Sequence, residues 1–226
     1  ELTGGASDNR FTVSNWSGGG ALNGGAGVDT VTLARSTNFT LSDTALSTSD
    51  GSNWTLAGVD RAELTGGIGG NQFLVNGWTG QGTLDGGAGN DQVVATKSGN
   101  LVLTDASLVS SDGMSFTILA IELASLTGDA GNNVIDAAAF AGQVTAFGLA
   151  GNDRLIGGSG NDTLDGGDGD DVVIGNAGSD RMWGGRGRDL LVGGTGTDRL
   201  DGGVGEDILI GGTTQHDADQ SALDAV

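Results

Sequence analysis

The sequence of 226 residues contains no cysteine, no proline and no tyrosine, and only six phenylalanines and four tryptophans. The lack of cysteine fits a protein that avoids disulfide-forming machinery. So few aromatic side chains build a compact globular core with difficulty, whereas small aliphatic residues are enough to fill a thin solenoid of stacked coils. The composition therefore favours a solenoid.

Histidine occurs once, at His216, and lysine once, at Lys97. A single histidine excludes the HExxH zinc motif and any chemistry that needs two histidines. The sequence also has no GxSxG nucleophile elbow, and its glycine clusters lack the GK[ST] of a phosphate-binding loop. We therefore expect no enzymatic activity.

Acidic residues outnumber basic residues by 29 to nine, which gives a formal net charge of −20. Phosphate binding requires basic surface, so nucleic acid is excluded as a partner. The sequence has no signal peptide and no apolar run long enough to span a membrane, so we expect no membrane insertion. It starts without methionine inside the motif ELTGG and stops without a clear ending, which predicts a piece of a longer protein.

Residues 148–210 consist of seven consecutive nonapeptide units, the first being GLAGNDRLI. Each unit has a glycine-rich bend, an aspartate at its sixth position and an apolar residue at its eighth. The aspartates are Asp153, Asp162, Asp171, Asp180, Asp189, Asp198 and Asp207.

Glycine takes positive φ at little cost, and a chain bent in this way points carbonyl oxygens into one hollow. Calcium prefers six to eight hard oxygen ligands, which carbonyls and a carboxylate of a neighbouring turn can supply. Because the aspartates recur in register, we favour bound Ca²⁺ over the alternative of a solvated acidic surface. Two units make one coil, so the aspartates of alternate units should stack: Asp153, Asp171, Asp189 and Asp207 on one edge, and Asp162, Asp180 and Asp198 on the other.

This pattern resembles the hemolysin-type, or RTX, calcium-binding repeat, a nonapeptide signature of parallel β-helices. The resemblance implies several bound calcium ions, export as an unfolded chain through a type I secretion channel, and folding outside the cell.

A longer repeat precedes the nonapeptides. Residues 1–34 return at 63–95 and, in eroded form, from residue 125, so that the same 62-residue offset occurs twice. The gaps between glycine turns at 24–66 and 86–128 each have room for one coil whose turn lacks the motif. We predict an all-β parallel β-roll or β-helix solenoid of about eleven coils. Residues 1–147 would form wider coils, 148–210 the nonapeptide β-roll, and 211–226 a cap in which Asp217 begins a short helix to Val226.

Alternation of apolar and polar residues predicts which side chains point inward. The predicted inward residues are Phe11, Val13, Val31, Leu33, Phe73, Val75, Val93, Ile135 and the eighth-position residues from Leu155 through Met182 to Leu209. On one of the two nonapeptide sheets the outward positions are also mostly apolar, from Ile156 and Val172 to Ile210. We expect a covering contact there, from the tail helix, a second copy or a further domain. The alternative is that β-branched residues there simply favour strands.

The first glycine turn of each long repeat carries asparagine at the aspartate position, at Asn9, Asn71 and Asn133. An amide oxygen can ligate calcium but lacks the charge of a carboxylate. We therefore predict weaker or fewer calcium sites before residue 148, with Asp29 and Asp91 as the best candidates. In the other interpretation, the asparagines only shape the bend.

The 62-residue repeats resemble those of giant secreted bacterial surface proteins. We therefore expect an extracellular, calcium-dependent structural, adhesive or filament-forming module that contacts calcium and copies of itself. A first alternative is the secretion and folding domain of a type I secreted enzyme or toxin. A second is a carbohydrate-binding or carbohydrate-modifying module, although the tryptophans are scattered.

Overall fold

The computed structural model describes residues 1–212, and every regular element of this range is a β-strand. No helix in this range is long and apolar enough to cross a membrane. The predicted helix from Asp217 to Val226 lies outside the described residues. The chain forms two compact units. Unit 1 comprises Glu1–Ala95, Ala106–Val109 and Gly113–Glu122, and unit 2 comprises Thr96–Asp105, Ser110–Asp112 and the described residues from Leu123.

The strands of unit 1 are β1 (Leu2–Thr3), β2 (Arg10–Thr12), β3 (Gly19–Asn23), β4 (Thr30–Ala34), β5 (Phe39–Ser42), β6 (Ala45–Thr48), β7 (Asn53–Ala57), β8 (Arg61–Thr65), β9 (Gln72–Gly77), β10 (Gln81–Asp85), β11 (Gln92–Thr96), β13 (Ser107–Ser110) and β14 (Ser115–Leu119). They form two sheets with the orders β1-β3-β7-β6-β5-β9-β11 and β2-β4-β8-β10-β14-β13. Most neighbours are parallel, as coils that alternate between two sheets require.

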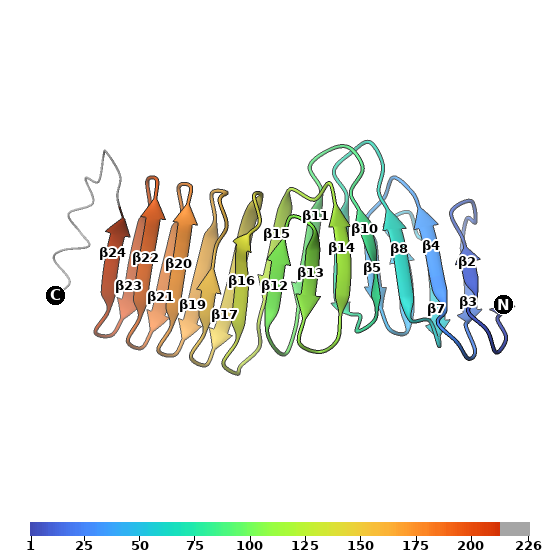
Figure 1. Cartoon of the computed structure of the whole chain (residues 1–226), viewed down its shortest axis with the longest axis horizontal. Coiled ribbons are helices and arrows are strands. Elements are labelled where there is room, and N and C mark those ends of the chain that lie inside the picture. The colour runs from blue at the N-terminus through green and yellow to red at the C-terminus, as the bar shows by residue number, and fades with distance from the viewer. Residues whose placement is uncertain (213–226) are drawn as a thin grey trace. The chain divides into compact units, whose positions relative to one another are not determined.

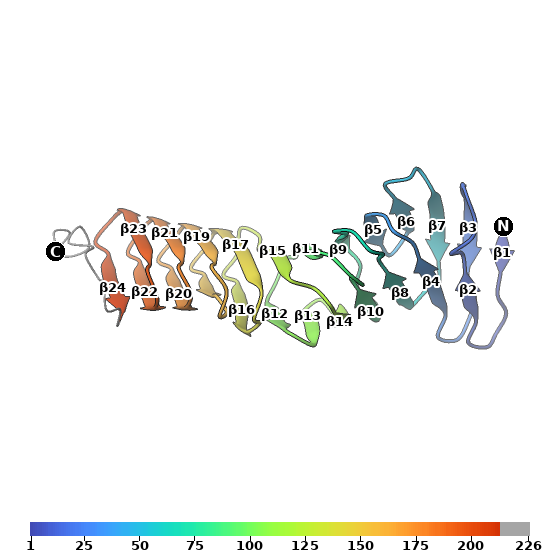
Figure 2. The same cartoon turned by 90° about the horizontal axis from the view of Figure 1, so that it is seen from above.

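The two long gaps between glycine turns do not hold simple coils, contrary to our prediction. In the first gap β5, β6 and β7 form an antiparallel meander, in which β5 pairs with β6 and β6 with β7 (Figure 2). In the second gap β13 and β14 are also antiparallel. The sequence signal for these reversals is an Asp-Gly pair, at Asp50-Gly51 and Asp112-Gly113, whose glycines take φ of 92° and 108°.

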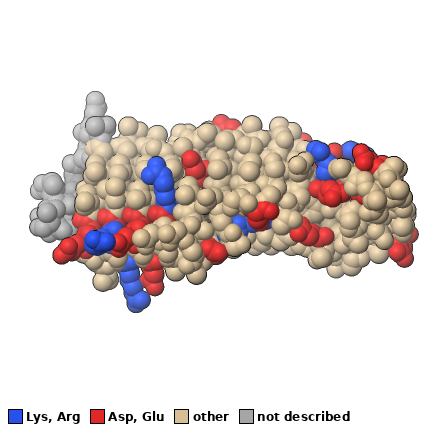
Figure 3. Space-filling model, turned by 60° about the horizontal axis from the view of Figure 1, so that its bottom comes forward, with Lys and Arg blue, Asp and Glu red and all other residues tan. Residues whose placement is uncertain are grey.

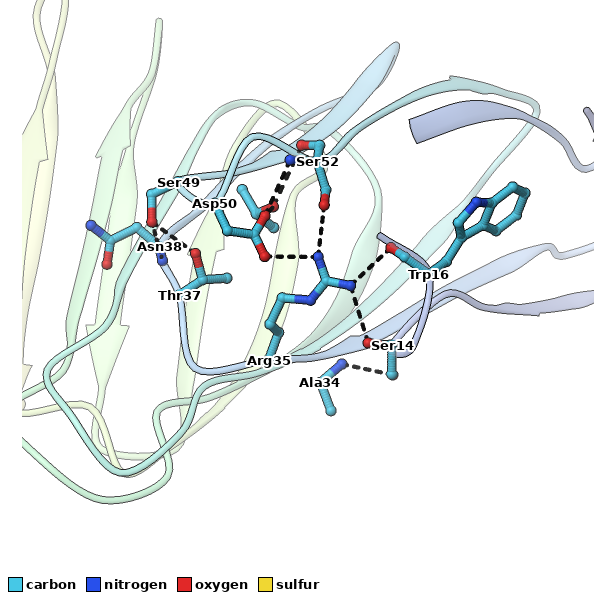
Figure 4. Close-up of polar contacts among 10 residues, drawn as sticks. Ser14, Trp16, Ala34, Arg35, Thr37, Asn38, Ser49, Asp50 and Ser52 are labelled. Carbon is cyan, nitrogen blue, oxygen red and sulfur yellow. Dashed lines mark hydrogen bonds and ion pairs between the residues drawn. The ribbon is translucent and has the colours of Figure 1, made fainter. Parts of the chain in front are cut away.

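Each antiparallel insertion is held by a basic side chain. The two basic residues, Arg35 and Lys97, are 62 residues apart and so occupy the same position in consecutive long repeats. Arg35 donates to Asp50 at 2.9 Å, to Ser52 at 2.8 Å and to two backbone carbonyls (Figure 4). Its guanidinium also lies 5.8 Å from the ring centroid of Trp54. In unit 2 the equivalent Lys97 is 3% exposed and forms an ion pair with Asp112 at 2.9 Å. The single lysine of the chain therefore has a structural position.

The strands of unit 2 are β12 (Leu101–Thr104), β15 (Leu123–Thr127), β16 (Val134–Ala139), β17 (Gln143–Ala150), β18 (Arg154–Ile156), β19 (Thr163–Asp168), β20 (Val172–Ala177), β21 (Arg181–Arg186), β22 (Leu190–Thr195), β23 (Arg199–Val204) and β24 (Ile208–Gly212). They form two parallel sheets with the orders β15-β17-β19-β21-β23 and β12-β16-β18-β20-β22-β24 (Figure 1). From β18 on, each strand pairs with the equivalent strand two nonapeptides later, as in Arg154 with Val172 and Val172 with Leu190. This register confirms that two nonapeptides form one coil.

The predicted inward residues form the core of both units. All of those named up to Ile135 are at most 8% exposed, and so are the eighth-position residues from Leu155 to Leu191. Leu200 and Leu209, on the last two strands, are half-buried. In unit 1 the core also contains the stacked rings of Phe39 and Phe73, whose centroids are 5.0 Å apart.

The apolar outward row of unit 2 is only partly accessible along most of its length. Val172, Ile174, Leu190 and Val192 are half-buried, whereas Ile208 and Ile210 are 61% and 49% exposed. Ile156 lies between Asp136 and Ile174 in its sheet and is buried, contrary to its predicted outward position.

Candidate calcium sites

The sixth-position aspartates of unit 2 stack on neighbouring coils, as the two-nonapeptide coil predicted. The Oδ1 atom of Asp171 accepts the backbone N–H of Asp153 at 2.7 Å, and Oδ1 of Asp189 accepts that of Asp171 at 2.8 Å. The same contact joins Asp180 to Asp162 on the other edge at 2.8 Å. One carboxylate oxygen of each aspartate therefore ties its turn to the preceding turn.

Eight of the glycine turns, here called left-handed turns, have positive φ at both their second and fourth residues. They are residues 24–29, 86–91, 148–153, 166–171, 175–180, 184–189, 193–198 and 202–207. In most of them the Oδ2 atom of the aspartate is buried and has no hydrogen-bond partner among the described residues, and six of these aspartates are also buried as whole side chains. These aspartates are Asp29, Asp91, Asp153, Asp171, Asp180 and Asp189, and each is at most 3% exposed.

Four further turns, here called capped turns, lack positive φ at these positions. They are residues 4–9, 66–71, 128–133 and 157–162. In each, a side-chain oxygen of the sixth residue accepts the N–H of the second: Asn9 from Gly5, Asn71 from Gly67, Asn133 from Asp129 and Asp162 from Gly158, at 2.7–2.8 Å. The geometry therefore agrees with the interpretation that the asparagines shape the bend, and it places Asp162 with them.

Each capped turn begins a column of left-handed turns. Asn9 donates its N–H to Asp29, Asn71 to Asp91, Asn133 to Asp153 and Asp162 to Asp180. In unit 2 one column then continues through residues 166–171, 184–189 and 202–207, and the other through 193–198. The orphaned carboxylate oxygens thus lie in rows between successive coils.

A space beside the first glycine of each left-handed turn is lined by oxygen. A Cβ atom on Gly166 would lie 2.4 Å from Oδ2 of Asp171 and 2.7 Å from the carbonyl oxygen of Gly184. Gly184 has the same relation to Asp189 and to the carbonyl of Gly202, at 2.4 and 2.6 Å. Any side chain at the first position would fill this hollow, so glycine is required there.

These rows of oxygen fit calcium. Leaving a buried carboxylate oxygen without a partner is costly, and stacked carboxylates repel one another. Residues 1–212 contain no cluster of three or more acidic, histidine or cysteine side chains suited to a metal. A bound cation would therefore be held by one carboxylate per turn together with backbone carbonyls, a set of hard oxygen ligands that calcium accepts. Of the predicted ligands, Asp198 and Asp207 also lie in left-handed turns, where their Oδ1 atoms accept the N–H of Asp180 and Asp189.

Sequence reasoning missed two acidic residues of unit 1. The N–H of Asp29 donates to Oδ2 of Asp60 at 2.8 Å, and that of Asp91 to Oε2 of Glu122 at 2.9 Å. These contacts replace the aspartate of a following glycine turn. The only sequence signal is that Asp60 and Glu122 are both acidic and occupy the same position in consecutive long repeats.

A second ladder of hydrogen bonds runs outside the first one, at the fifth position of the turns. Oδ1 of Asn152 accepts the N–H of Asp170 at 3.1 Å, and Oδ1 of Asp170 accepts that of Arg188 at 2.9 Å. The Arg188 guanidinium also donates to Asp170 at 2.5 Å. This contact is the largest reason why the pKa of Asp170 lies below its usual range. Figure 3 shows that acidic side chains on the visible face gather in groups, the largest near the C-terminal end of the described chain.

Burial raises the pKa of five stacked aspartates, Asp153, Asp162, Asp171, Asp180 and Asp189. The pKa of Asp171 is raised to about 6 and that of Asp180 to about 7, mainly by desolvation and secondarily by the charges of the aspartates above and below. Burial also raises the pKa of Asp162 to about 6, although two backbone N–H donors oppose the shift. In the metal-free protein these carboxyl groups hold protons far more readily than exposed aspartates do.

These pKa values predict opposite effects of acid with and without calcium. A carboxyl group whose pKa is higher in the folded state than in the unfolded state stabilises the fold below about pH 4. This stabilisation is lost as the pH rises through the folded-state pKa values of about 6 to 7. In EGTA, lowering the pH from about 7.5 to about 5 should therefore increase the folded fraction. In calcium the same change should lower the melting temperature, because protons compete for the ligands. Circular dichroism melts in both buffers check this, and effects of equal sign would contradict it.

Leu149 occupies the second position of the turn 148–153 with φ of 85°, where most of the left-handed turns have glycine. Its side chain is 50% exposed, so it gains little from burial. Leu149→Gly should therefore stabilise unit 2 by about 1 kcal/mol through relief of backbone strain. Thermal melts in calcium measure the change. The matched variant Gly167→Ala, at φ of 108°, should destabilise; equal effects of the two would be inconsistent with the strain argument.

The chain matches the family model of the RTX calcium-binding nonapeptide repeat in four copies, over residues 76–96, 125–144, 147–182 and 183–213. Among solved structures it is similar to the extracellular lipase LipA from Serratia marcescens, with 22% identity over 89% of this chain and a TM-score of 0.26. The chain corresponds to 34% of the length of that lipase chain. No curated protein sequence gives a significant match.

Proposed function

The chain is an RTX calcium-binding nonapeptide repeat protein, and on that premise we propose that it is a structural module of a larger secreted protein whose folding depends on extracellular calcium. The observation that carries this proposal is the row of buried, unpartnered Oδ2 atoms, of which Asp153, Asp171 and Asp189 form one column. Without a cation these carboxylates oppose folding, and with millimolar calcium each bound ion stabilises the folded chain.

The test compares the far-UV circular dichroism of the whole chain in EGTA and in millimolar calcium at neutral pH. We expect strand signal in calcium, loss of most of it in EGTA and recovery when calcium is restored. Magnesium at the same concentration is the control, because it demands octahedral geometry and gives up water reluctantly. Strand signal that is insensitive to EGTA, together with no heat of calcium binding, would refute the proposal.

Such coupling suits a protein that leaves the cell unfolded. Calcium-poor cytoplasm would keep the carboxylates repelling one another, and the chain would wind into coils only outside the cell. Type I secretion, which RTX proteins typically use, needs a chain of this kind. Measuring calcium-dependent protease resistance at cytosolic and extracellular calcium levels tests this step. A chain that resists the protease equally at both levels would not need the secretion route to fold.

The adhesive or filamentous role rests on the apolar outward row of unit 2, which is most exposed at Ile208 and Ile210. Apolar surface of this kind is usually covered by a partner, and a second copy of the chain would offer the same row. Sedimentation velocity in calcium should show concentration-dependent association. The double substitution Ile208→Thr and Ile210→Thr, which keeps β-branched side chains, should abolish it. A strictly monomeric chain at high concentration would leave the module as a spacer.

The competing role, the secretion and folding domain of an enzyme or toxin, predicts a catalytic or pore-forming segment elsewhere in the gene. Sequencing the gene upstream of the codon for Glu1 distinguishes it from the structural role.

A further inference from the structure

We propose that each 62-residue repeat of unit 1 holds one further divalent cation, between a left-handed turn and an acidic bend that lies outside the nonapeptide pattern. The acidic bends are residues 58–60 and 120–122. The inference rests on the proposed calcium dependence but gives a role to segments that the family match does not cover. The acidic bends 58–60 and 120–122 and the turn 24–29 lie outside all four matched segments, whereas the turn 86–91 lies within the segment 76–96.

The first acidic bend has three residues and stands where a glycine turn of six residues would otherwise connect two strands. It connects β7 to β8, which pair with β3 and β4 on either side of the left-handed turn 24–29. Backbone hydrogen bonds fix it over that turn, from Gly24 to the carbonyl of Ala57 at 2.8 Å and from Asp60 to the carbonyl of Asp29 at 2.9 Å. The Asp60 carboxylate completes the contact by accepting the N–H of Asp29 at 2.8 Å.

The second acidic bend repeats this arrangement with different residues. Gly86 donates to the carbonyl of Leu119 at 2.9 Å, and Glu122 donates to that of Asp91 at 3.1 Å. Its first residue, Ala120, has φ of 48°, a left-handed value that alanine rarely adopts, and its counterpart Gly58 has φ of 58°. The two bends keep one conformation although the sequences Gly-Val-Asp and Ala-Ile-Glu share no residue, so the conformation and the acidic third position are the common features.

Both sites contain the oxygen arrangement of the nonapeptide columns. Asp29 and Asp91 are fully buried, and their Oδ2 atoms have no hydrogen-bond partner. A Cβ atom on Gly24 would lie 2.5 Å from Oδ2 of Asp29 and 1.9 Å from the carbonyl oxygen of Gly58. The acidic bend therefore supplies the carbonyl that a following glycine turn supplies in unit 2.

The equivalent distances from Gly86 are 2.6 Å to Oδ2 of Asp91 and 2.0 Å to the carbonyl of Ala120. A buried carboxylate oxygen facing a carbonyl oxygen is repulsive without a cation between the two groups. Hard oxygen ligands select calcium over softer metals. Asp60 and Glu122 are positioning residues, which hold the acidic bend on the turn and add negative charge near the ion.

The first acidic bend borders an open pocket. Val59, Asp60 and Arg61 line an open pocket of about 410 Å³ on unit 1, together with Asp43 and Thr79. The Asp43 carboxylate in this pocket already accepts two hydrogen bonds from Thr79, one from its N–H at 2.7 Å and one from its hydroxyl at 2.9 Å.

The experiment counts calcium ions bound to the whole chain, by native mass spectrometry and calorimetric titration. Asp29→Asn and Asp91→Asn should each remove one ion, and the double variant two. Asp171→Asn, in the nonapeptides, is the control that should lower the count independently. A double variant that binds as many ions as the wild type, while Asp171→Asn binds fewer, would overturn the inference and leave the proposed function standing. A wild-type chain that binds no calcium would overturn both.

A second pair of variants preserves the buried aspartates. Asp60→Asn keeps an oxygen that can accept the N–H of Asp29 but loses the charge, and it should weaken one ion about 10-fold or more. Asp60→Glu introduces the side chain found at position 122 and should bind within a few-fold of wild type. If the Asp29 variant fails to fold in calcium, the two Asp60 variants still test the inference. Calcium affinities of Asp60→Asn that equal those of the wild type at every site would show that the acidic bend does not contribute to calcium binding.

Discussion

Asp180→Asn should remove calcium binding from its column and lower the melting temperature of unit 2 in calcium by about 10 °C, whereas Asp162→Asn should change either property little. Asp180 lies in a left-handed turn with an unpartnered Oδ2, while Oδ2 of Asp162 already accepts the N–H of Gly158 at 2.7 Å. Loss of one bound ion at saturating calcium forfeits roughly 3 to 4 kcal/mol, and each kcal/mol shifts the melting temperature by about 2 to 4 °C in a chain of this size.

The control is built into the chain, because the equivalent capped turn 128–133 already carries asparagine at Asn133. Calorimetric titration gives the ion count, and melts in calcium and in EGTA separate lost binding from lost packing. In EGTA the Asp180 variant should be at least as stable as the wild type, since a buried charge has been removed. Equal loss of calcium in both variants would show that the two kinds of turn do not differ in function.

Gly187→Ala should destabilise unit 2 by about 3 kcal/mol or more, and Gly131→Ala should be neutral or slightly stabilising. Both glycines hold the fourth position of the motif. Gly187 has φ of 129°, and a Cβ on it would lie 2.1 Å from the carbonyl oxygen of Gly169 on the preceding coil. Gly131 lies in a capped turn, where the nearest atom to an added Cβ is the flexible Asp129 carboxylate at 3.2 Å. Alanine there mainly reduces the freedom of the unfolded chain.

Melts in calcium measure both substitutions. The first should lower the melting temperature by about 6 to 12 °C, because a backbone carbonyl cannot move away without opening the ladder between two coils. If Gly131→Ala is as damaging as Gly187→Ala, then glycine is needed at this position for a reason other than backbone conformation.

The periodic part of the fold could be predicted from the sequence because each unit is a local repetition. An apolar eighth position and a coil of two nonapeptides determine which side chains are inside and which turns stack, and Leu155, Val173 and Leu191 lie where the period placed them. The antiparallel insertions could not be predicted from this period. They depend on hairpins at Asp50-Gly51 and Asp112-Gly113, whose signal lies within segments we interpreted as coils.

Of the candidate calcium sites, only the residues that recur at the sixth position of the glycine turns could be predicted from the sequence. The sequence separates Asn9, Asn71 and Asn133 from the aspartates, but GGSGND at 157–162 differs from its neighbours in no residue type that would predict a capped turn. That difference arises from backbone angles and from one hydrogen bond to Gly158. Asp60 and Glu122 were missed for another reason, since their role depends on β7 and β14 returning beside β3 and β10 across long separations in sequence.

The regular register of unit 2 makes its length adjustable. Arg154, Val172, Leu190 and Ile208 are successive partners along one sheet, and Thr163, Arg181 and Arg199 along the other. Excising residues 166–183 would place Asp153 and Asp189 on adjacent coils and join strands of matching geometry. The shortened protein should therefore lose one coil and keep its fold. Excising a single nonapeptide instead would exchange the two edges for every later turn. Growth and shrinkage of such a protein by gene duplication is therefore expected to proceed in steps of two nonapeptides.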